Sequence, residues 1–161
     1  MENPKVLDIG KLEIGQDDSC RAFLFFMNDN TQYAGLKCAH SMDVIDYIRD
    51  GFPYTTVHQI LNTTCVSRKD LSNILHLSLR QMNRYSNEDV LPAEQSGFVY
   101  ELSRLYVCGL DTFGDKATFE SWLLRAQPAL GMKSPLSLLD TTEGFRMVND
   151  LLSRIEYGFY S

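Results

Sequence analysis

The chain has 161 residues, which suits one domain or two small ones with a real hydrophobic core. Its composition is ordinary for a globular protein, and no run of about 18 apolar residues could span a membrane. The formal net charge of −6 excludes a strongly basic nucleic-acid binder but is compatible with a local basic stripe. Because the first residues lack the pattern of a signal peptide, we expect a cytoplasmic protein.

Residue types that usually carry catalysis or bind metals are scattered along the chain. The four cysteines lie far apart without a CxxC pair, which predicts reduced structural thiols instead of a zinc site or a disulfide framework; they are Cys20, Cys38, Cys65 and Cys108. The three histidines are isolated as well, and no GxSxG or phosphate-binding glycine motif occurs. We therefore expect no enzymatic activity, no cofactor and no metal site.

Residues 1–40 are predicted to form an N-terminal extension or a small subdomain. Within them, the run RAFLFFM at residues 21–27 lies between the turn signals GQDD and NDN. Its apolar residues predict either a strand or a buried segment without strand structure.

From residue 41 onward the pattern is helical. A first helix begins with a cap at Ser41 and stops at Gly51, and its apolar stripe is Val44, Ile45 and Ile48. A short helix follows in YTTVHQILNTT, with Val57, Ile60 and Leu61 facing inward. A longer helix opens at Pro92 and carries Phe98, Leu102 and Leu105 at helical spacing.

Two short helices between them, within residues 67–85, match a helix-turn-helix pattern. Ser67 and Asp70 form a start that resembles a capping box, and Ser78 can cap the second helix, LRQMNRY. The residues predicted to pack inward are Leu71, Ile74, Leu75, Leu77 and Met82. Those predicted to contact DNA phosphates and base edges are Arg68, Lys69, Ser78, Arg80, Gln81 and Arg84. The alternative is an ordinary helix pair with solvated arginines, and His76 stands where such a turn usually has glycine.

The last third of the chain carries denser signals. A helix in DKATFESWLL has Phe119, Trp122 and Leu123 on one face and is expected to end by Pro128. Ser134-Pro135 starts a short helical turn. The last helix is capped by Thr141 or Thr142 and stops at Gly158, and its apolar stripe is Phe145, Val148, Leu151, Leu152 and Ile155. The aromatic tail beyond it either folds back onto its own domain or inserts into a partner.

This last segment resembles the toxin-binding domain of the Xre/ParS/MbcA antitoxins, the partners of RES-domain toxins. The matching residues are Trp122-Leu123, Pro128-Ala129-Leu130-Gly131, Pro135, Leu138-Leu139-Asp140, Gly144, Val148, Leu152, Arg154-Ile155-Glu156 and Gly158. The sequence departs from the pattern at Gln127, where the family often has Asn, and at Met132, which replaces a second Gly. The resemblance covers roughly residues 41–161, and it is strongest in the last third.

The resemblance implies a mainly helical protein with a helix-turn-helix domain at residues 41–112 and a toxin-binding domain at residues 113–161. It implies a type II antitoxin that blocks the NAD site of a NAD-depleting RES toxin with its C-terminal end. It also implies repression of its own operon. The expected partners are a RES toxin from the adjacent gene, operator DNA and a second copy of the chain. The toxin-binding residues carried over are Arg154, Glu156, Tyr157, Gly158, Phe159, Tyr160 and Ser161. The alternative is a helix-turn-helix regulator whose C-terminal domain serves only oligomerisation.

Overall fold

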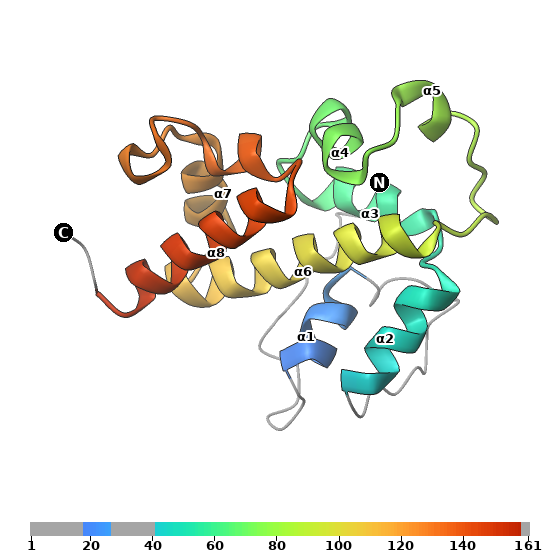
Figure 1. Ribbon diagram of the computed structural model, residues 1–161, viewed down its shortest axis with the longest axis horizontal. Coiled ribbons are helices and arrows are strands. Elements are labelled where there is room, and N and C mark those ends of the chain that lie inside the picture. The colour runs from blue at the N-terminus through green and yellow to red at the C-terminus, as the bar shows by residue number, and fades with distance from the viewer. Residues whose placement is uncertain (1–17, 27–40, 159–161) are drawn as a thin grey trace, which may run out of the picture. The chain divides into compact units, whose positions relative to one another are not determined.

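A computed structural model describes residues 18–26 and 41–158 of the protein (Figure 1). These residues form eight α-helices and two 3₁₀ helices, and no strand occurs among them, which confirms the mainly helical prediction. The α-helices are α1 (Asp18–Phe25), α2 (Ser41–Asp50), α3 (Thr55–Thr63), α4 (Arg68–Leu75), α5 (Leu79–Met82), α6 (Ala93–Phe113), α7 (Lys116–Leu124) and α8 (Thr142–Glu156). The 3₁₀ helices are η3 (Pro128–Leu130) and η4 (Pro135–Leu138).

The described residues divide into two compact units. The first unit comprises residues 18–26, 41–63 and 86–104, and the second comprises residues 64–85 and 105–158. Helix α6 contributes to both, because the division falls within it.

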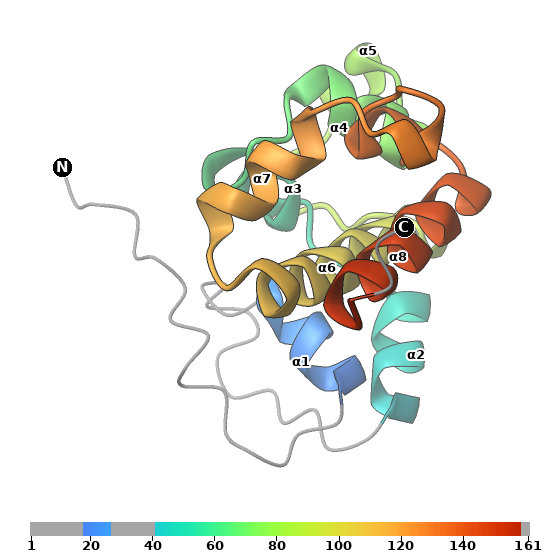
Figure 2. The ribbon, with the colours of Figure 1, turned by 90° about the vertical axis from the view of Figure 1, so that its left-hand side faces the viewer.

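In the first unit, α1 differs from one of the two structures predicted for its sequence. The strand predicted as one reading of residues 21–27 is wrong, because Asp18–Phe25 is an α-helix; Met27 lies outside the described residues. The predicted burial is right, since Ala22, Phe23, Phe25 and Phe26 are buried at helical spacing. Phe23 stacks on Tyr47 of α2 with ring centroids 4.8 Å apart, and α1 and α2 lie side by side (Figures 1 and 2). Packing against a neighbouring helix therefore overrides the strand propensity of a phenylalanine-rich run.

Helix α2 ends at Gly51 as predicted. Gly51 has a φ of +92°, and its N–H donates to the Tyr47 carbonyl over 3.1 Å. The predicted apolar stripe is only partly buried: Val44 is buried, but Ile45 is exposed. Tyr47 makes the packing contact instead, because the ring of Phe23 lies on its side of the helix. In α3, Val57 and Ile60 are buried as predicted, while Leu61 is half-buried.

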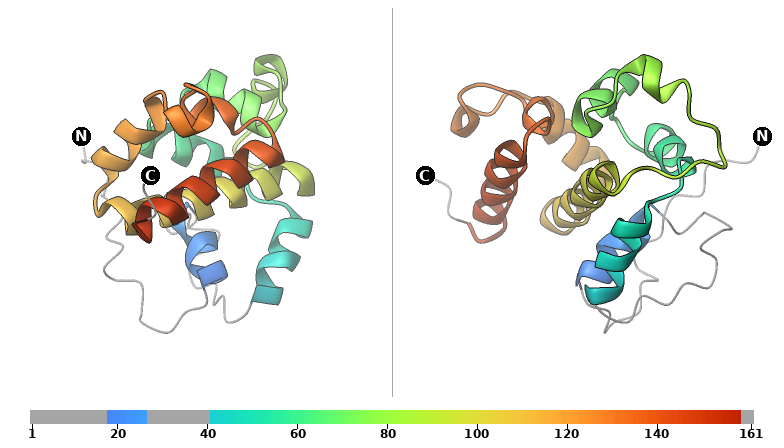
Figure 3. Two further views of the ribbon diagram at one scale, coloured as in Figure 1. Left: turned by 60° about the vertical axis from the view of Figure 1, so that its left-hand side comes forward. Right: turned by 45° about the vertical axis from the view of Figure 1, so that its right-hand side comes forward.

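The second unit is built from α4, α5, α7, α8, both 3₁₀ helices and the C-terminal part of α6 (Figure 3). Its core includes Leu71, Leu75, Leu105, Phe119, Leu123, Leu139, Val148 and Leu152. Two glycines allow the closest approaches. A Cβ at Gly109 of α6 would lie 2.2 Å from the Phe119 ring, and one at Gly144 of α8 would lie 1.6 Å from the Leu138 carbonyl oxygen. Any larger residue at either position must displace its neighbour.

The two glycines inside α6 provide a matched test of this packing. Gly109→Ala is expected to lower the free energy of unfolding by about 1–3 kcal/mol, because the new methyl group overlaps a buried ring. Gly97→Ala meets no atom within 4 Å and is expected to raise it by about 0.4–1 kcal/mol through the unfolded chain's entropy. Urea unfolding measures both, and an equal effect of the two substitutions would contradict the packing described here.

Candidate functional site

Helices α4 and α5 form the predicted helix-turn-helix-like pair, and both have side-chain caps. The Ser67 Oγ accepts from the Asp70 N–H at 3.1 Å. At α5 the capping box is complete: Ser78 Oγ accepts from the Gln81 N–H at 3.1 Å, and Gln81 Oε1 accepts from the Ser78 N–H at 2.8 Å. The inward-facing set is buried as predicted: Leu71, Ile74, Leu75, Leu77 and Met82.

His76 adopts the left-handed conformation that the turn requires, with φ 54° and ψ 36°. The turn is closed by the Leu77 N–H, which donates to the Ser72 carbonyl at 3.1 Å. The His76 Nε2 lies 2.6 Å from the Asp140 carbonyl oxygen, in the loop before α8. This hydrogen bond offsets part of the cost of a left-handed backbone in a residue with a Cβ. A histidine in place of glycine therefore does not prevent the turn.

The second helix of the pair is shorter than predicted. The sequence pattern extends it over residues 79–85, but α5 ends at Met82 and is about 6 Å long. The two residues that follow Met82, Asn83 and Arg84, are exposed, so a further helical turn would bury neither side chain. Asn83 instead accepts a hydrogen bond from the Arg68 guanidinium.

All six residues predicted to contact DNA are exposed on this pair: Arg68, Lys69, Ser78, Arg80, Gln81 and Arg84. Among the described residues, no carboxylate pairs with Lys69, Arg80 or Arg84. Their charges are thus available to an external anion. Ser78 and Gln81 are exposed too, although their side chains already form the capping box.

Helix α8 carries the predicted cap and apolar stripe. Thr141 Oγ1 accepts from the Gly144 N–H at 2.9 Å. Phe145, Val148, Leu151 and Leu152 are buried, and Ile155 is half-buried. On the outer face, Arg146 contacts Asp150 at 2.7 Å and also bonds Glu143, which lowers the pKa of the Glu143 carboxyl. These i,i+3 and i,i+4 pairs stabilise the helix on its exposed face.

The end of α8 leaves an aromatic side chain in solvent. Gly158 adopts a φ of +72°, and its N–H donates to the Ile155 carbonyl at 3.2 Å, which confirms the predicted stop. Tyr157, the residue before it, is 72% exposed. Arg154 and Glu156 are exposed beside it. Of the predicted toxin-binding residues, Phe159, Tyr160 and Ser161 lie outside the described residues.

A partly buried polar network joins the segment before α4 to α6 and α7. Glu120 Oε1 accepts from the Cys65 N–H at 2.8 Å and from the Tyr106 hydroxyl at 2.9 Å. Burial raises the pKa of the Cys65 thiol and of the Tyr106 hydroxyl, so both stay protonated at neutral pH. Cys65 is therefore placed as a structural thiol and not as a nucleophile. Among the described residues, no cluster of His, Cys, Asp and Glu could hold a metal ion.

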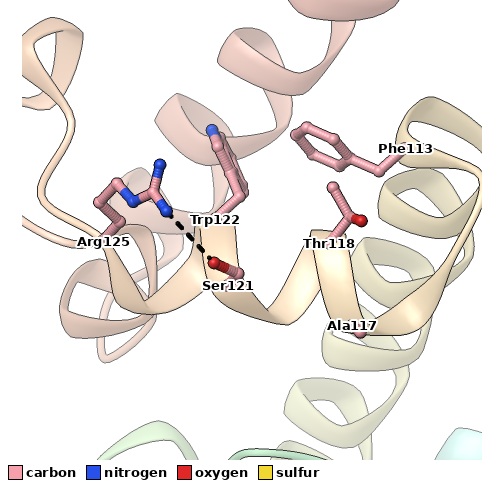
Figure 4. A pocket seen from close by; sticks show the side chains of 6 residues that line it. All are labelled: Phe113, Ala117, Thr118, Ser121, Trp122 and Arg125. Carbon is pink, nitrogen blue, oxygen red and sulfur yellow. Dashed lines mark hydrogen bonds between the residues drawn. The ribbon is translucent and has the colours of Figure 1, made fainter.

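A pocket of about 420 Å³ opens beside α7 (Figure 4). Its lining is Phe113, Ala117, Thr118, Ser121, Trp122 and Arg125. From the sequence, Trp122 was predicted only to share a helix face with Phe119 and Leu123, and the pocket was missed. A signal was present: Ala117 and Ser121 are small residues at the i, i+4 spacing that places them on one helix face.

These features together define a class of helical protein: a capped helix-turn-helix-like pair combined with a helical domain that ends on an exposed tyrosine. The family model for the antitoxin Xre/MbcA/ParS C-terminal toxin-binding domain matches residues 109–158. The chain is 31% identical over 116 residues to "Antitoxin Xre" of Photorhabdus laumondii, covering 71% of this chain and 78% of that protein. The chain therefore belongs to the Xre/MbcA/ParS-type antitoxins.

Two further relatives agree with this assignment. "Antitoxin Xre" of Yersinia enterocolitica is 27% identical over 129 residues, which cover 79% of this chain and 87% of that protein. "Prs ADP-ribosylating antitoxin" of a Sphingobium species is 28% identical over 139 residues, covering 80% and 87%. The protein is thus an antitoxin with a C-terminal toxin-binding domain. In the described part of the chain, every helix is too short or too polar to cross a membrane.

The anchored histidine of the turn can be tested by two substitutions. His76→Ala loses the ring's hydrogen bond and keeps the left-handed strain, so it should lower the free energy of unfolding by about 1 kcal/mol. His76→Gly loses the same bond but relieves strain, so it should be more stable than His76→Ala by about 1 kcal/mol. Urea unfolding distinguishes the two, and a less stable glycine variant would contradict the assigned strain.

Proposed function

We propose that this antitoxin neutralises a RES-domain, NAD-depleting toxin by placing the end of α8 and the following tail in the toxin's NAD site. The observation that carries the proposal is Tyr157, a large aromatic side chain left 72% exposed where the toxin-binding domain's last helix ends. Exposed rings at such a position are typical of binding surfaces. The RES class of the partner comes from the family resemblance of the sequence.

The chemistry of this end suits a narrow nucleotide cleft. Aromatic rings bury a large area with little loss of side-chain entropy, and Gly158 redirects the chain immediately after the helix. Arg154 is exposed, and no carboxylate of the described residues pairs with it, so its charge is available to the toxin. Glu156, Tyr157 and Gly158 complete the described part of the plug, and Phe159, Tyr160 and Ser161 extend it.

Removing residues 157–161 tests the plug directly. We expect the shortened protein to fold normally, because α8 ends at Glu156, and to lose protection against the toxin. The measurement is cellular NAD after induction of the adjacent gene's product together with each antitoxin variant. Met147→Ala, which removes another exposed apolar side chain of α8, serves as the control. Full protection by the shortened protein would contradict the plug.

We also infer that α4 and α5 bind operator DNA and repress the antitoxin's own operon. Lys69, Arg80 and Arg84 are exposed cations without carboxylate partners among the described residues, which is the state that phosphate contacts need. Because helix-turn-helix proteins read paired half-sites, the DNA-binding form is proposed to be a homodimer within a larger toxin–antitoxin complex. We further propose that the protein acts in the cytoplasm and has no enzymatic activity or cofactor of its own.

A double substitution tests the DNA contacts. Arg80→Ala with Arg84→Ala should weaken binding to the promoter and reduce the slope of log affinity against log salt by about two, one for each lost phosphate contact. Arg49→Ala with Arg104→Ala is the matched control, since it removes the same charge from residues that pair with carboxylates in the first unit. A salt slope that is the same in both double variants would show that DNA is bound elsewhere.

The family description does not support the alternative of a regulator whose C-terminal domain serves only oligomerisation, because it names toxin binding for residues 109–158. Co-expression with the adjacent gene, followed by co-purification, separates the two functions. A stable complex supports the antitoxin mechanism, whereas an antitoxin that purifies alone under these conditions would count against it.

A further inference from the structure

The outward face of α7 takes no part in the proposed plug or in the proposed DNA contacts. It consists of the exposed side chains of Ala117, Thr118, Ser121, Leu124 and Arg125. Leu124 is 56% exposed, although Phe119 and Leu123 already supply the buried face of this helix. The helix therefore carries apolar residues both toward the core and toward solvent, and an apolar side chain in solvent beside a pocket is typical of a binding surface.

The pocket gives this face a defined shape. The rings of Phe113 and Trp122 lie with centroids 5.5 Å apart at an interplanar angle of 42°, and Ala117 and Ser121 leave space beside them (Figure 4). Small residues on an exposed helix face allow another chain to approach closely. A pocket with aromatic walls and a polar rim fits an apolar side chain presented by a protein partner.

The polar groups at the pocket indicate which polar group of the partner should lie beside its apolar side chain. The Arg125 guanidinium reaches the Ser121 hydroxyl at 3.5 Å, the outer limit of a hydrogen bond, and no carboxylate of the described chain pairs with it. Arg146 of α8, in contrast, is held by two carboxylates. The exposed Arg125 donor therefore favours a partner that brings carboxylate or carbonyl oxygens.

We propose that the outward face of α7 is a second docking surface for the toxin, which inserts an apolar side chain beside an acidic group into the Phe113–Trp122 pocket. The toxin is the occupant because the pocket lies wholly within residues 109–158, the segment matched by the toxin-binding domain. Its role is affinity: it holds the toxin while the plug occupies the NAD site. The proposal rests on the proposed function, but it can be tested separately from the plug.

Trp122 is the only tryptophan in the chain, so it reports on the pocket directly. The antitoxin is labelled with 5-fluorotryptophan and titrated with the unlabelled product of the adjacent gene, and the single fluorine resonance is followed by NMR. We expect the resonance to shift with the full-length antitoxin and also with the variant that lacks residues 157–161. The second result would separate docking from the plug, because this variant retains the pocket and has lost the tail.

Substitutions test the chemistry of the pocket by their effect on toxin affinity. Arg125→Glu should weaken binding about tenfold or more by placing a negative charge beside the partner's acidic group. Ser121→Gln should weaken it similarly by filling the pocket without a change of charge. Lys116→Glu, the same charge change at an exposed position of α7 outside the pocket lining, should stay within about threefold of the parent. All three positions are exposed, so unfolding midpoints should not change.

Four outcomes would overturn the proposal. One is a stable complex in which the fluorine resonance does not shift, and this result would leave the plug intact. Another is an equal effect of Arg125→Glu and Lys116→Glu on affinity. A third is a resonance that shifts with antitoxin concentration alone, which would assign the face to a second copy of the chain. If the adjacent gene's product does not bind the full-length antitoxin at all, the proposed function and this docking surface fail together.

Discussion

The second unit depends on the close approach of α7 to α6, which the missing side chain of Gly109 allows. Phe119 occupies the space beside this glycine and packs edge-on against Tyr106, with centroids 5.1 Å apart. The same ring stacks on Phe113 and Trp122, so one contact also fixes the two rings that line the pocket. The close approach of α7 to α6 therefore decides which residues of α7 are buried and which are exposed to solvent.

Hydrogen bonds connect the packed helices α6, α7 and α8 to the helix-turn-helix-like pair. Glu120 follows Phe119 on α7 and accepts from Tyr106 and from the Cys65 backbone, just before α4. At the other end of α4, His76 bonds the Asp140 carbonyl in front of α8. The helix pair thus belongs to the same compact unit as α7 and α8. The division of the chain at residues 112 and 113 into DNA-binding and toxin-binding domains stays a prediction.

Sequence reasoning succeeded where the signal is local. The caps at Ser67, Ser78 and Thr141 satisfy backbone donors within the next three residues, so they could be recognised without knowledge of the fold. The stop at Gly158 is equally local, because a left-handed residue ends a helix by itself. Burial along α8 followed from its spacing of apolar residues.

Prediction from the sequence failed where contacts with residues distant in the chain decide the structure. The run at residues 21–27 favours a strand by composition, yet its residues up to Phe25 belong to α1, where Phe23 packs on the rings of Tyr47 and Phe52. The second helix of the pair ends at Met82, and the next residue, Asn83, accepts a hydrogen bond from Arg68 of α4. The pocket of α7 was missed because Phe113 and Trp122 are nine residues apart on two helices, and their approach is set by the turn between α6 and α7.

The sequence by itself determined the helical class, the capped helix pair, the last amphipathic helix and the antitoxin family, because each is encoded by residues a few positions apart. The tertiary structure alone decided the helical state of the first described segment and the anchoring of His76. It also decided which side of α7 is left open. These features depend on contacts between residues far apart in the chain, whose free energy of packing no local pattern records.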